Sequence, residues 1–164
     1  MRRGSLRAVR TAAVLLATAG AAAGCGEQAP VSEQFTDGGV AVTVTATDGQ
    51  VVARLRPERA GFHLYSLSLP DAGVDGLGIP TRLSVSGALT ATGAPRTDAE
   101  ERTVRPEGLD VALPVYADGP VTVVLPVKRT GDGEARIVLT YGACSERGGC
   151  LPPVRERAVA VELG

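Results

Sequence analysis

The run Val40-Ala41-Val42-Thr43-Val44-Thr45 decides the fold class, because valines occupy every second position through it. Successive side chains of a β-strand point to opposite faces, so this period of two is typical of a strand with one buried face. Seven further runs with strand-forming character follow along the chain, at residues 51–56, 61–69, 81–89, 111–116, 121–128, 136–141 and 158–163. The sequence therefore predicts a succession of short strands.

Turn-forming residues separate these runs, at Asp48-Gly49, Asp118-Gly119-Pro120 and Gly131-Asp132-Gly133. No window shows a sustained apolar stripe at helical spacing. Seven or eight short strands within about 125 residues predict an all-β fold, a single antiparallel β-sandwich of the immunoglobulin-like type over residues 37–164. With only 3% aromatic residues, its core is expected to consist of Val, Leu, Ile and Ala.

The N-terminus has the parts of an export signal. Four arginines, at positions 2, 3, 7 and 10, precede a short apolar run that is too short to span a bilayer. The run ends in Ala22-Ala23-Gly24-Cys25, which resembles the bacterial lipobox, with Ala22 where Leu is commoner. The resemblance implies a lipoprotein signal peptide at 1–24, a lipid on Cys25 and a polar tether over 25–36; the alternative is an ordinary secretory signal followed by a stray cysteine.

Removal of the signal changes the charge of the chain. The full sequence carries 17 Lys and Arg against 18 Asp and Glu; without the four N-terminal arginines 13 basic residues remain, a formal net charge of −5. This balance argues against nucleic-acid binding. A lipid anchor would hold the domain at the extracytoplasmic face of the cell membrane.

The cysteine count predicts a crosslink. If Cys25 carries lipid, two of the three cysteines remain, Cys144 and Cys150. Outside the cytoplasm two thiols so close in sequence are expected to oxidise, which predicts a Cys144–Cys150 disulfide. His63 is the single histidine of the chain, and two Cys with one distant His make a poor tetrahedral site. We therefore expect neither a bound metal nor a cofactor.

The spacing of the two cysteines leaves the role of the disulfide open. A ring of about seven residues contributes about 2.4 kcal/mol, little for a crosslink, and it ties no distant parts of a sandwich together. Gly148 and Gly149 leave the backbone before Cys150 unobstructed, which would allow a partner's sulfur to approach. Arg147 favours a thiolate and Glu146 opposes one. Spacing alone favours neither a redox-active nor a structural bond.

The residues around this pair carry a family signature. Tyr141, Cys144, Cys150, Pro152 and Pro153 form a Tyr-x-x-Cys-x5-Cys-x-Pro-Pro run. It resembles the N-terminal periplasmic domain of the thiol:disulfide interchange protein DsbD, in which this run holds the redox-active cysteines. Segments in the same order also resemble family strands: Gly61-Phe62-His63-Leu64-Tyr65, and Tyr116-Ala117-Asp118 followed by Val124-Leu125-Pro126-Val127. The resemblance covers roughly residues 35 to 163.

The resemblance implies an immunoglobulin-like sandwich that relays electrons. The expected partners are a thioredoxin-like protein that receives electrons from a membrane electron transporter, and exported acceptor proteins that contain disulfides. Matched residue by residue, Cys150 would form the mixed disulfide and Cys144 would resolve it. Tyr65 falls on a tyrosine that lines the family's site, and His63 replaces a second one. The competing interpretation of His63 is a partly exposed strand histidine without a role.

The sequence also departs from the family. The family covers its disulfide with a loop that bears an acidic pair and an aromatic residue, whereas residues 105–111 here offer only Glu107 and, as a smaller lid, Leu109. The transporter and thioredoxin-like parts of DsbD are absent from this sequence. A second hypothesis therefore stays open, a non-catalytic lipoprotein whose sandwich binds a protein or ligand and whose disulfide is structural. The sequence does not decide whether the chain is a thiol:disulfide interchange enzyme component.

Overall fold

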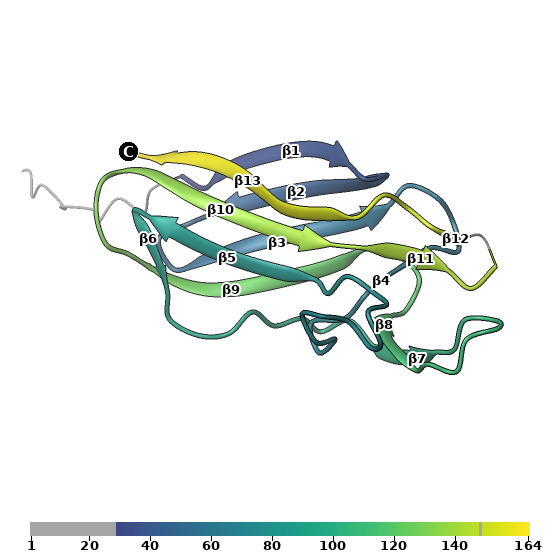
Figure 1. The fold of residues 1–164 in the computed structure, drawn as a ribbon. Coiled ribbons are helices and arrows are strands. Elements are labelled where there is room, and N and C mark those ends of the chain that lie inside the picture. Colours follow the sequence, from purple (N-terminus) through teal and green to yellow (C-terminus); the bar gives the residue numbers. More distant parts are fainter. Residues whose placement is uncertain (1–28, 148) are drawn as a thin grey trace, which may run out of the picture.

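The computed structural model describes residues 29–147 and 149–164 and consists there of β-strands and loops (Figure 1). The predicted signal peptide at 1–24 and Cys25 lie outside the described residues. No helix in the described part of the chain is long and apolar enough to cross a membrane. The strands are β1 (Val31–Asp37), β2 (Val40–Ala46), β3 (Gln50–Pro57), β4 (His63–Leu64), β5 (Arg82–Gly87), β6 (Leu89–Ala91), β7 (Glu101–Val104), β8 (Leu113–Tyr116), β9 (Val121–Arg129), β10 (Gly133–Tyr141), β11 (Ala143–Ser145), β12 (Gly149–Cys150) and β13 (Val154–Leu163).

Two antiparallel sheets form the body of the sandwich. One has the strand order β1-β2-β3-β9-β6 and the other the order β13-β10-β5. Figure 1 shows them as two layers, with β13 running beside β1 along one side. The predicted all-β antiparallel sandwich is confirmed.

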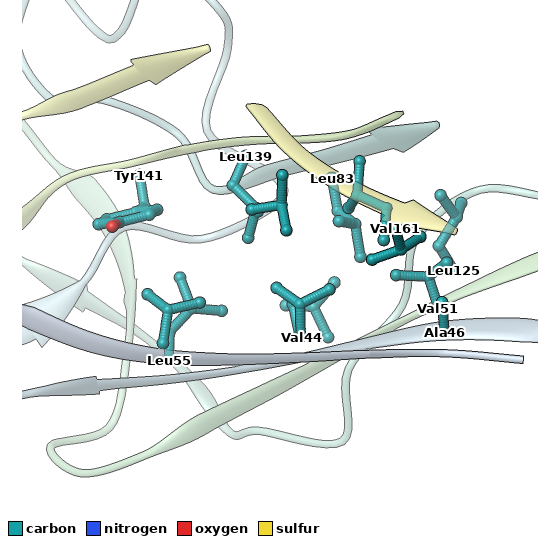
Figure 2. Packing of buried hydrophobic residues seen from close by; sticks show 14 of the residues in the cluster. Val44, Ala46, Val51, Leu55, Leu83, Leu125, Leu139, Tyr141 and Val161 are labelled. Atoms are coloured by element: carbon teal, nitrogen blue, oxygen red, sulfur yellow. The ribbon is translucent and has the colours of Figure 1, made fainter. Parts of the chain in front are cut away.

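The core between the layers follows the predicted alternation. In β2 the side chains of Val40, Val42, Val44 and Ala46 are buried and the intervening ones less so. Figure 2 shows valines and leucines of both layers meeting, with Leu139 opposite Val44. Most of this cluster is Val, Leu, Ile or Ala, as the composition led us to expect. Such β-branched and aliphatic side chains pack well on pleated surfaces.

The sandwich begins earlier than predicted. Strand β1 starts at Val31 and pairs with β2 along its whole length, so residues 31–36 are not a tether. Val31 and Phe35 pack against the core, while Ser32, Glu33 and Gln34 are exposed because β1 is an edge strand. An edge strand with several polar side chains has the composition of a linker, which explains the wrong boundary.

The run 61–69 forms a shorter strand than predicted. Only His63 and Leu64 form a strand, and Tyr65 adds an isolated bridge to Val115 before the chain leaves the sheet. The backbone after them is held by Arg82, whose guanidinium donates hydrogen bonds to the carbonyl oxygens of Leu67 and Leu69 at 2.9 and 2.6 Å. A side chain thus satisfies carbonyl groups that a neighbouring strand would otherwise bond.

The run 81–89 crosses from one sheet to the other. Strand β5 pairs with β10, whereas β6 pairs with β9 in the opposite layer. The change occurs at Gly87, which has a φ of +78° and whose added Cβ would lie 2.6 Å from the carbonyl oxygen of Glu134. Only glycine fits this corner.

One end of the sandwich carries two small sheets, β12-β11-β4 and β7-β8. The chain passes from β10 into β11 through Gly142, where an added Cβ would meet Ile79 at 2.9 Å. A second, smaller core lies here, made of Tyr65, Leu69, Val104, Leu113, Val115 and Cys144. Cys144 is therefore fixed by a strand that continues out of the main core.

Opposite faces of β3 should differ sharply in their tolerance to truncation. Leu55 is fully buried and its neighbour Arg54 is exposed. We expect Leu55→Ala to lower the free energy of unfolding by about 2–5 kcal/mol through lost contacts and a cavity, and Arg54→Ala to change it by no more than about 0.5 kcal/mol. Urea unfolding of the two variants measures both. Equal losses would contradict the assigned faces of β3.

Candidate functional site

The predicted disulfide joins Cys144 in β11 to Cys150 in β12, with an S–S distance of 1.97 Å. The two residues are direct cross-strand partners, and the Leu151 amide donates to the Ala143 carbonyl beside them. On the other side of β11 the Tyr65 amide donates to the Gly142 carbonyl. Backbone groups alternate in direction along a strand, so those of Cys144 are directed at β4. The cysteines are thus a non-hydrogen-bonded pair, in which side chains lie closest, and their Cα atoms are 4.0 Å apart.

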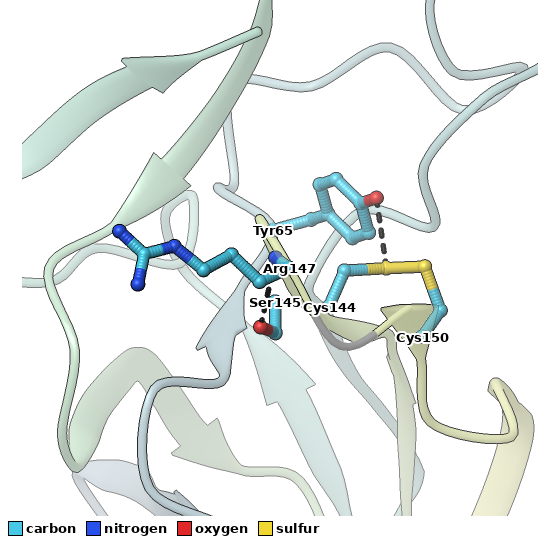
Figure 3. The surroundings of a disulfide bond; sticks show 5 residues. All are labelled: Tyr65, Cys144, Ser145, Arg147 and Cys150. Carbon is cyan, nitrogen blue, oxygen red and sulfur yellow. Dashed lines mark hydrogen bonds between the residues drawn. A yellow bond between two sulfur atoms is a disulfide. The ribbon is translucent and has the colours of Figure 1, made fainter. Parts of the chain in front are cut away.

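The two sulfurs have unequal surroundings. Cys144 is 7% exposed and belongs to the smaller core, whereas Cys150 is exposed. The hydroxyl of Tyr65 donates a hydrogen bond to the Sγ of Cys144 at 3.0 Å (Figure 3). Burial raises the pKa of Tyr65, so its hydroxyl keeps the proton that it donates. An incoming thiolate therefore has access to Cys150 rather than to Cys144.

Tyr65 is held from three directions. Its amide donates to the carbonyl of Gly142, just before β11, and its carbonyl accepts a hydrogen bond of 2.6 Å from the buried hydroxyl of Thr81. Its ring lies close to Gly78, where an added Cβ would be 3.2 Å from the ring and 2.7 Å from Leu69. Gly78 also has a φ of +86°. The hydroxyl of Tyr65 is thus directed at the sulfur by its surroundings.

A pocket of about 220 Å³ opens beside the disulfide. Segments far apart in the sequence meet there, from β4, β11, β12 and residues 105–112, which we call the cap segment. The structure brings together all six residues that the sequence predicted for the site, since the pocket is lined by Tyr65, His63, Glu107, Leu109, Cys144 and Cys150.

The cap segment connects β7 to β8 at the same end of the sandwich as the disulfide (Figure 1). A turn shapes it, in which the Leu109 amide donates to the Pro106 carbonyl and Gly108 takes a φ of +79°. Leu109 is 47% exposed, the highest value for a large apolar side chain among the described residues. It borders the pocket, in which Cys150 is also exposed.

His63 is 2% exposed, so the interpretation as a partly exposed strand histidine is wrong. It is the direct cross-strand partner of Cys144 on the side away from Cys150. Its Nδ1 lies 3.5 Å from an Arg102 nitrogen and 3.8 Å from a carboxylate oxygen of Asp118. Burial, followed by the charge of Arg102, lowers the pKa of His63 despite the opposing carboxylates of Asp118 and Glu146.

Sequence reasoning missed Arg102. From β7 its guanidinium donates to Glu146 at 2.7 Å and to Asp118 at 3.0 Å. Glu146 lies in the loop between the cysteines and Asp118 follows β8, so one side chain joins three segments. Asp118 belongs to the Tyr116-Ala117-Asp118 segment that resembles a family strand. Arg102 belongs to no such segment, and only the register of β7 against β8 brings it to the site.

The hairpin between β1 and β2 supports the far side of the site. Gly38 and Gly39 both have positive φ, at +56° and +70°, which suits a two-residue hairpin turn. An added Cβ on Gly38 would lie 2.4 Å from the carbonyl oxygen of Pro152, and one on Gly39 would lie 3.2 Å from Leu151. The chain after Cys150 is thus packed on this turn. The Asp-Gly-Gly sequence at 37–39 was the available signal for it.

Metal ligands do not gather in the described part of the chain. No group of three or more His, Cys, Asp or Glu side chains is arranged there to hold an ion. The site offers two sulfurs, a phenol, an imidazole and an ion-paired guanidinium.

Comparison with solved structures supports the fold. The N-terminal domain of DsbD from Neisseria meningitidis, in its reduced form, matches with a TM-score of 0.52 and 22% identity over 76% of this chain and 85% of that one. This likeness confirms the immunoglobulin-like sandwich. A structure of the complex between the DsbD and PilB N-terminal domains of the same organism matches with a TM-score of 0.44 and 22% identity over 83% of each chain.

The sequence itself identifies the family. No curated protein matches the chain. A family profile for the thiol:disulfide interchange protein DsbD, N-terminal, matches residues 28–162. This match spans most of the sequence and includes the sandwich, the disulfide and the cap segment, so the chain belongs to the family of the DsbD N-terminal domain.

Proposed function

We propose that this protein is a membrane-anchored, extracytoplasmic thiol–disulfide exchange domain that relays electrons between a thioredoxin-like donor and exported acceptor proteins. One observation carries the proposal, a disulfide with one exposed sulfur and one buried sulfur that accepts a hydrogen bond from Tyr65. Exchange requires an accessible sulfur and a stabilised leaving thiolate, and this arrangement supplies both.

In the first half of the cycle a donor thiolate attacks the Sγ of Cys150. The Cys144–Cys150 bond breaks, the bonding pair goes to Cys144, and a mixed disulfide joins Cys150 to the donor. The second thiol of the donor, as its thiolate, then attacks the donor sulfur of this bond and displaces Cys150. Two electrons and two protons have passed to the domain, and the donor leaves as a disulfide.

In the second half the thiolate of Cys150 attacks an acceptor disulfide. Cys144 then attacks Cys150 within the mixed disulfide and restores the internal bond, while the acceptor leaves as a dithiol. The direct cross-strand placement of the two cysteines favours this last step, because the resolving thiol is already beside its target.

Tyr65 stabilises Cys144 as a leaving group in this scheme. Its hydroxyl donates to the sulfur on which negative charge develops, and hydrogen bonds to charged groups are stronger than those between neutral groups. His63, Glu107 and Leu109 line the same pocket. We assign Glu107 and Leu109 to contact with the partner, since both are exposed on the cap segment.

A structural disulfide in a non-catalytic binding lipoprotein is the competing function. Family membership and the exposure of Cys150 favour exchange. The reduction potential separates the two, because structural disulfides lie below about −300 mV and resist reduction by thioredoxin-like donors. A value below that limit, with no reduction by thioredoxin, would refute the exchange function.

The two cysteines should differ in reactivity. In a Cys25→Ala background, Cys144→Ser leaves only the exposed Cys150, and Cys150→Ser leaves only the buried Cys144. We expect the former to displace thionitrobenzoate from a thioredoxin carrying it on its active-site sulfur at least about tenfold faster, because burial hinders approach and disfavours the thiolate. Absorbance of the released thionitrobenzoate measures both rates. Equal rates would contradict the assignment of Cys150 as the attacked sulfur.

Loss of the Tyr65 hydroxyl should slow reduction. Tyr65→Phe removes the donor to Cys144, and a hydrogen bond to a developing charge is worth about 1.5–3 kcal/mol. We expect reduction by thioredoxin to slow about tenfold or more, measured by stopped-flow fluorescence of the thioredoxin. Tyr141→Phe is the matched control, because that hydroxyl donates to the carbonyl of Asp37. An unchanged rate in Tyr65→Phe would exclude this role.

The lipid anchor has its own test. We expect Cys25→Ala to move the protein from the membrane fraction to the soluble fraction of cells and to abolish incorporation of labelled palmitate, because Cys25 is the proposed acylation site. Wild-type protein, labelled and fractionated in parallel, is the control. A Cys25→Ala protein that still takes up palmitate would contradict the assignment.

A further inference from the structure

Three polar side chains from three segments meet at the guanidinium of Arg102, close to the redox pocket. Arg102 lies in β7, the strand that leads into the cap segment. It bonds to Glu146 between the cysteines, to Asp118 after β8, and approaches Nδ1 of His63 in β4. The exchange scheme above uses none of these contacts.

We infer that Arg102 is a positioning residue of the redox site, which holds the loop between the cysteines against β7 and presents His63 to Cys144 as a neutral imidazole with its proton on Nε2. The inference rests on the proposed exchange function and adds to it a residue that controls the surroundings of the resolving sulfur.

Arg102 restrains the loop between the cysteines. Strands β11 and β12 are only three and two residues long, so few ladder hydrogen bonds hold the hairpin. While the disulfide is closed, it also ties the strands together. Once it is reduced, the 2.7 Å ion pair between Arg102 and Glu146 is a contact that still fastens the hairpin to the neighbouring sheet. It thereby keeps Cys150 near Cys144 for the resolving step.

Arg102 also determines the tautomer of His63. A guanidinium has only donors, so Nδ1 must accept its hydrogen bond and the ring proton of the neutral imidazole lies on Nε2. Direct cross-strand partners project to the same face of a sheet. His63 and Cys144 are such partners, and both line the pocket.

Arg102 also influences the charge of His63. The charged groups that face it are Arg102 from β7, Asp118 after β8 and Glu146 from the hairpin. Tyr65, Glu107 and Arg147 are the other titratable groups that line the pocket. The two carboxylates favour an imidazolium, and Arg102 together with burial opposes it. Without Arg102, His63 would gain a proton more readily and its positive charge would stabilise a Cys144 thiolate.

The single histidine makes a direct test possible, because the full chain purified without a histidine tag gives one imidazole Cε1–H signal by NMR. We expect its titration midpoint in the wild type to lie below 6.5. Arg102→Met should raise the midpoint above the wild-type value, and Arg102→Lys, which keeps the charge without the planar fork, should give a value between the two. Arg54→Met, on the outer face of β3, is the matched control and should leave it unchanged.

The redox readout is the equilibrium with glutathione. We expect Arg102→Met to shift it at least threefold toward the dithiol at pH 6, because the hairpin is less restrained and the imidazolium stabilises the thiolate. In the double variant His63→Gln with Arg102→Met, the part of the shift that varies with pH should disappear and the constant part should remain. A cooperative thermal transition establishes that each variant is folded.

Two results would overturn the inference. One is a midpoint in folded Arg102→Met equal to that of the wild type, and the other is a midpoint in Arg102→Lys equal to that in Arg102→Met. Failure of the exchange function itself looks different, since wild-type protein would then resist glutathione and thioredoxin while the histidine titrations kept their predicted order.

Discussion

The direction of the backbone groups of Cys144 controls the rest of the site. Because they bond toward β4, the residue forms a close, non-hydrogen-bonded pair with Cys150 on its other side. The same placement directs the sulfur of Cys144 into the smaller core, where the hydroxyl of Tyr65 reaches it. Cys150, on the outermost strand of the small sheet, stays exposed. The chemical difference between the two sulfurs thus follows from strand order and register.

The large core makes this register dependable. Strand β10 is the central strand of its sheet, paired on both sides, and its buried residues reach Tyr141. Only Gly142 separates β10 from β11, so the sandwich determines the position of Cys144. The cap segment is an eight-residue loop between the short strands β7 and β8, and β12 is a two-residue edge strand, so both have fewer such restraints. A rigid buried sulfur next to a less restrained exposed one suits a site that must admit other proteins.

The features that the sequence predicted are those with a local signal. Period-two alternation located β2 and β9, and the spacing of Cys144 and Cys150 predicted their bond. Strand β1 was missed because an edge strand needs few apolar residues, and β7, β11 and β12 because two to four residues carry no periodicity. The pocket residues came from the family signature and not from periodicity. Arg102 could not be found in either way, since its role depends on the long-range pairing of β7 and on the contacts of its side chain.

The length of β1 fixes how far the redox pair stands from the start of the sandwich. The chain enters at Val31, and the other end of β1 leads to the glycine turn that packs against Pro152, two residues beyond Cys150. Seven residues of strand span about 23 Å, while the six peptide units from Cys25 to Val31 extend at most about 22 Å. For a domain anchored as proposed, these two lengths would confine the exposed sulfur to a thin layer above the bilayer. Encounters with other membrane-bound proteins would then occur at a raised effective concentration, so that even weak docking contacts suffice for rapid turnover.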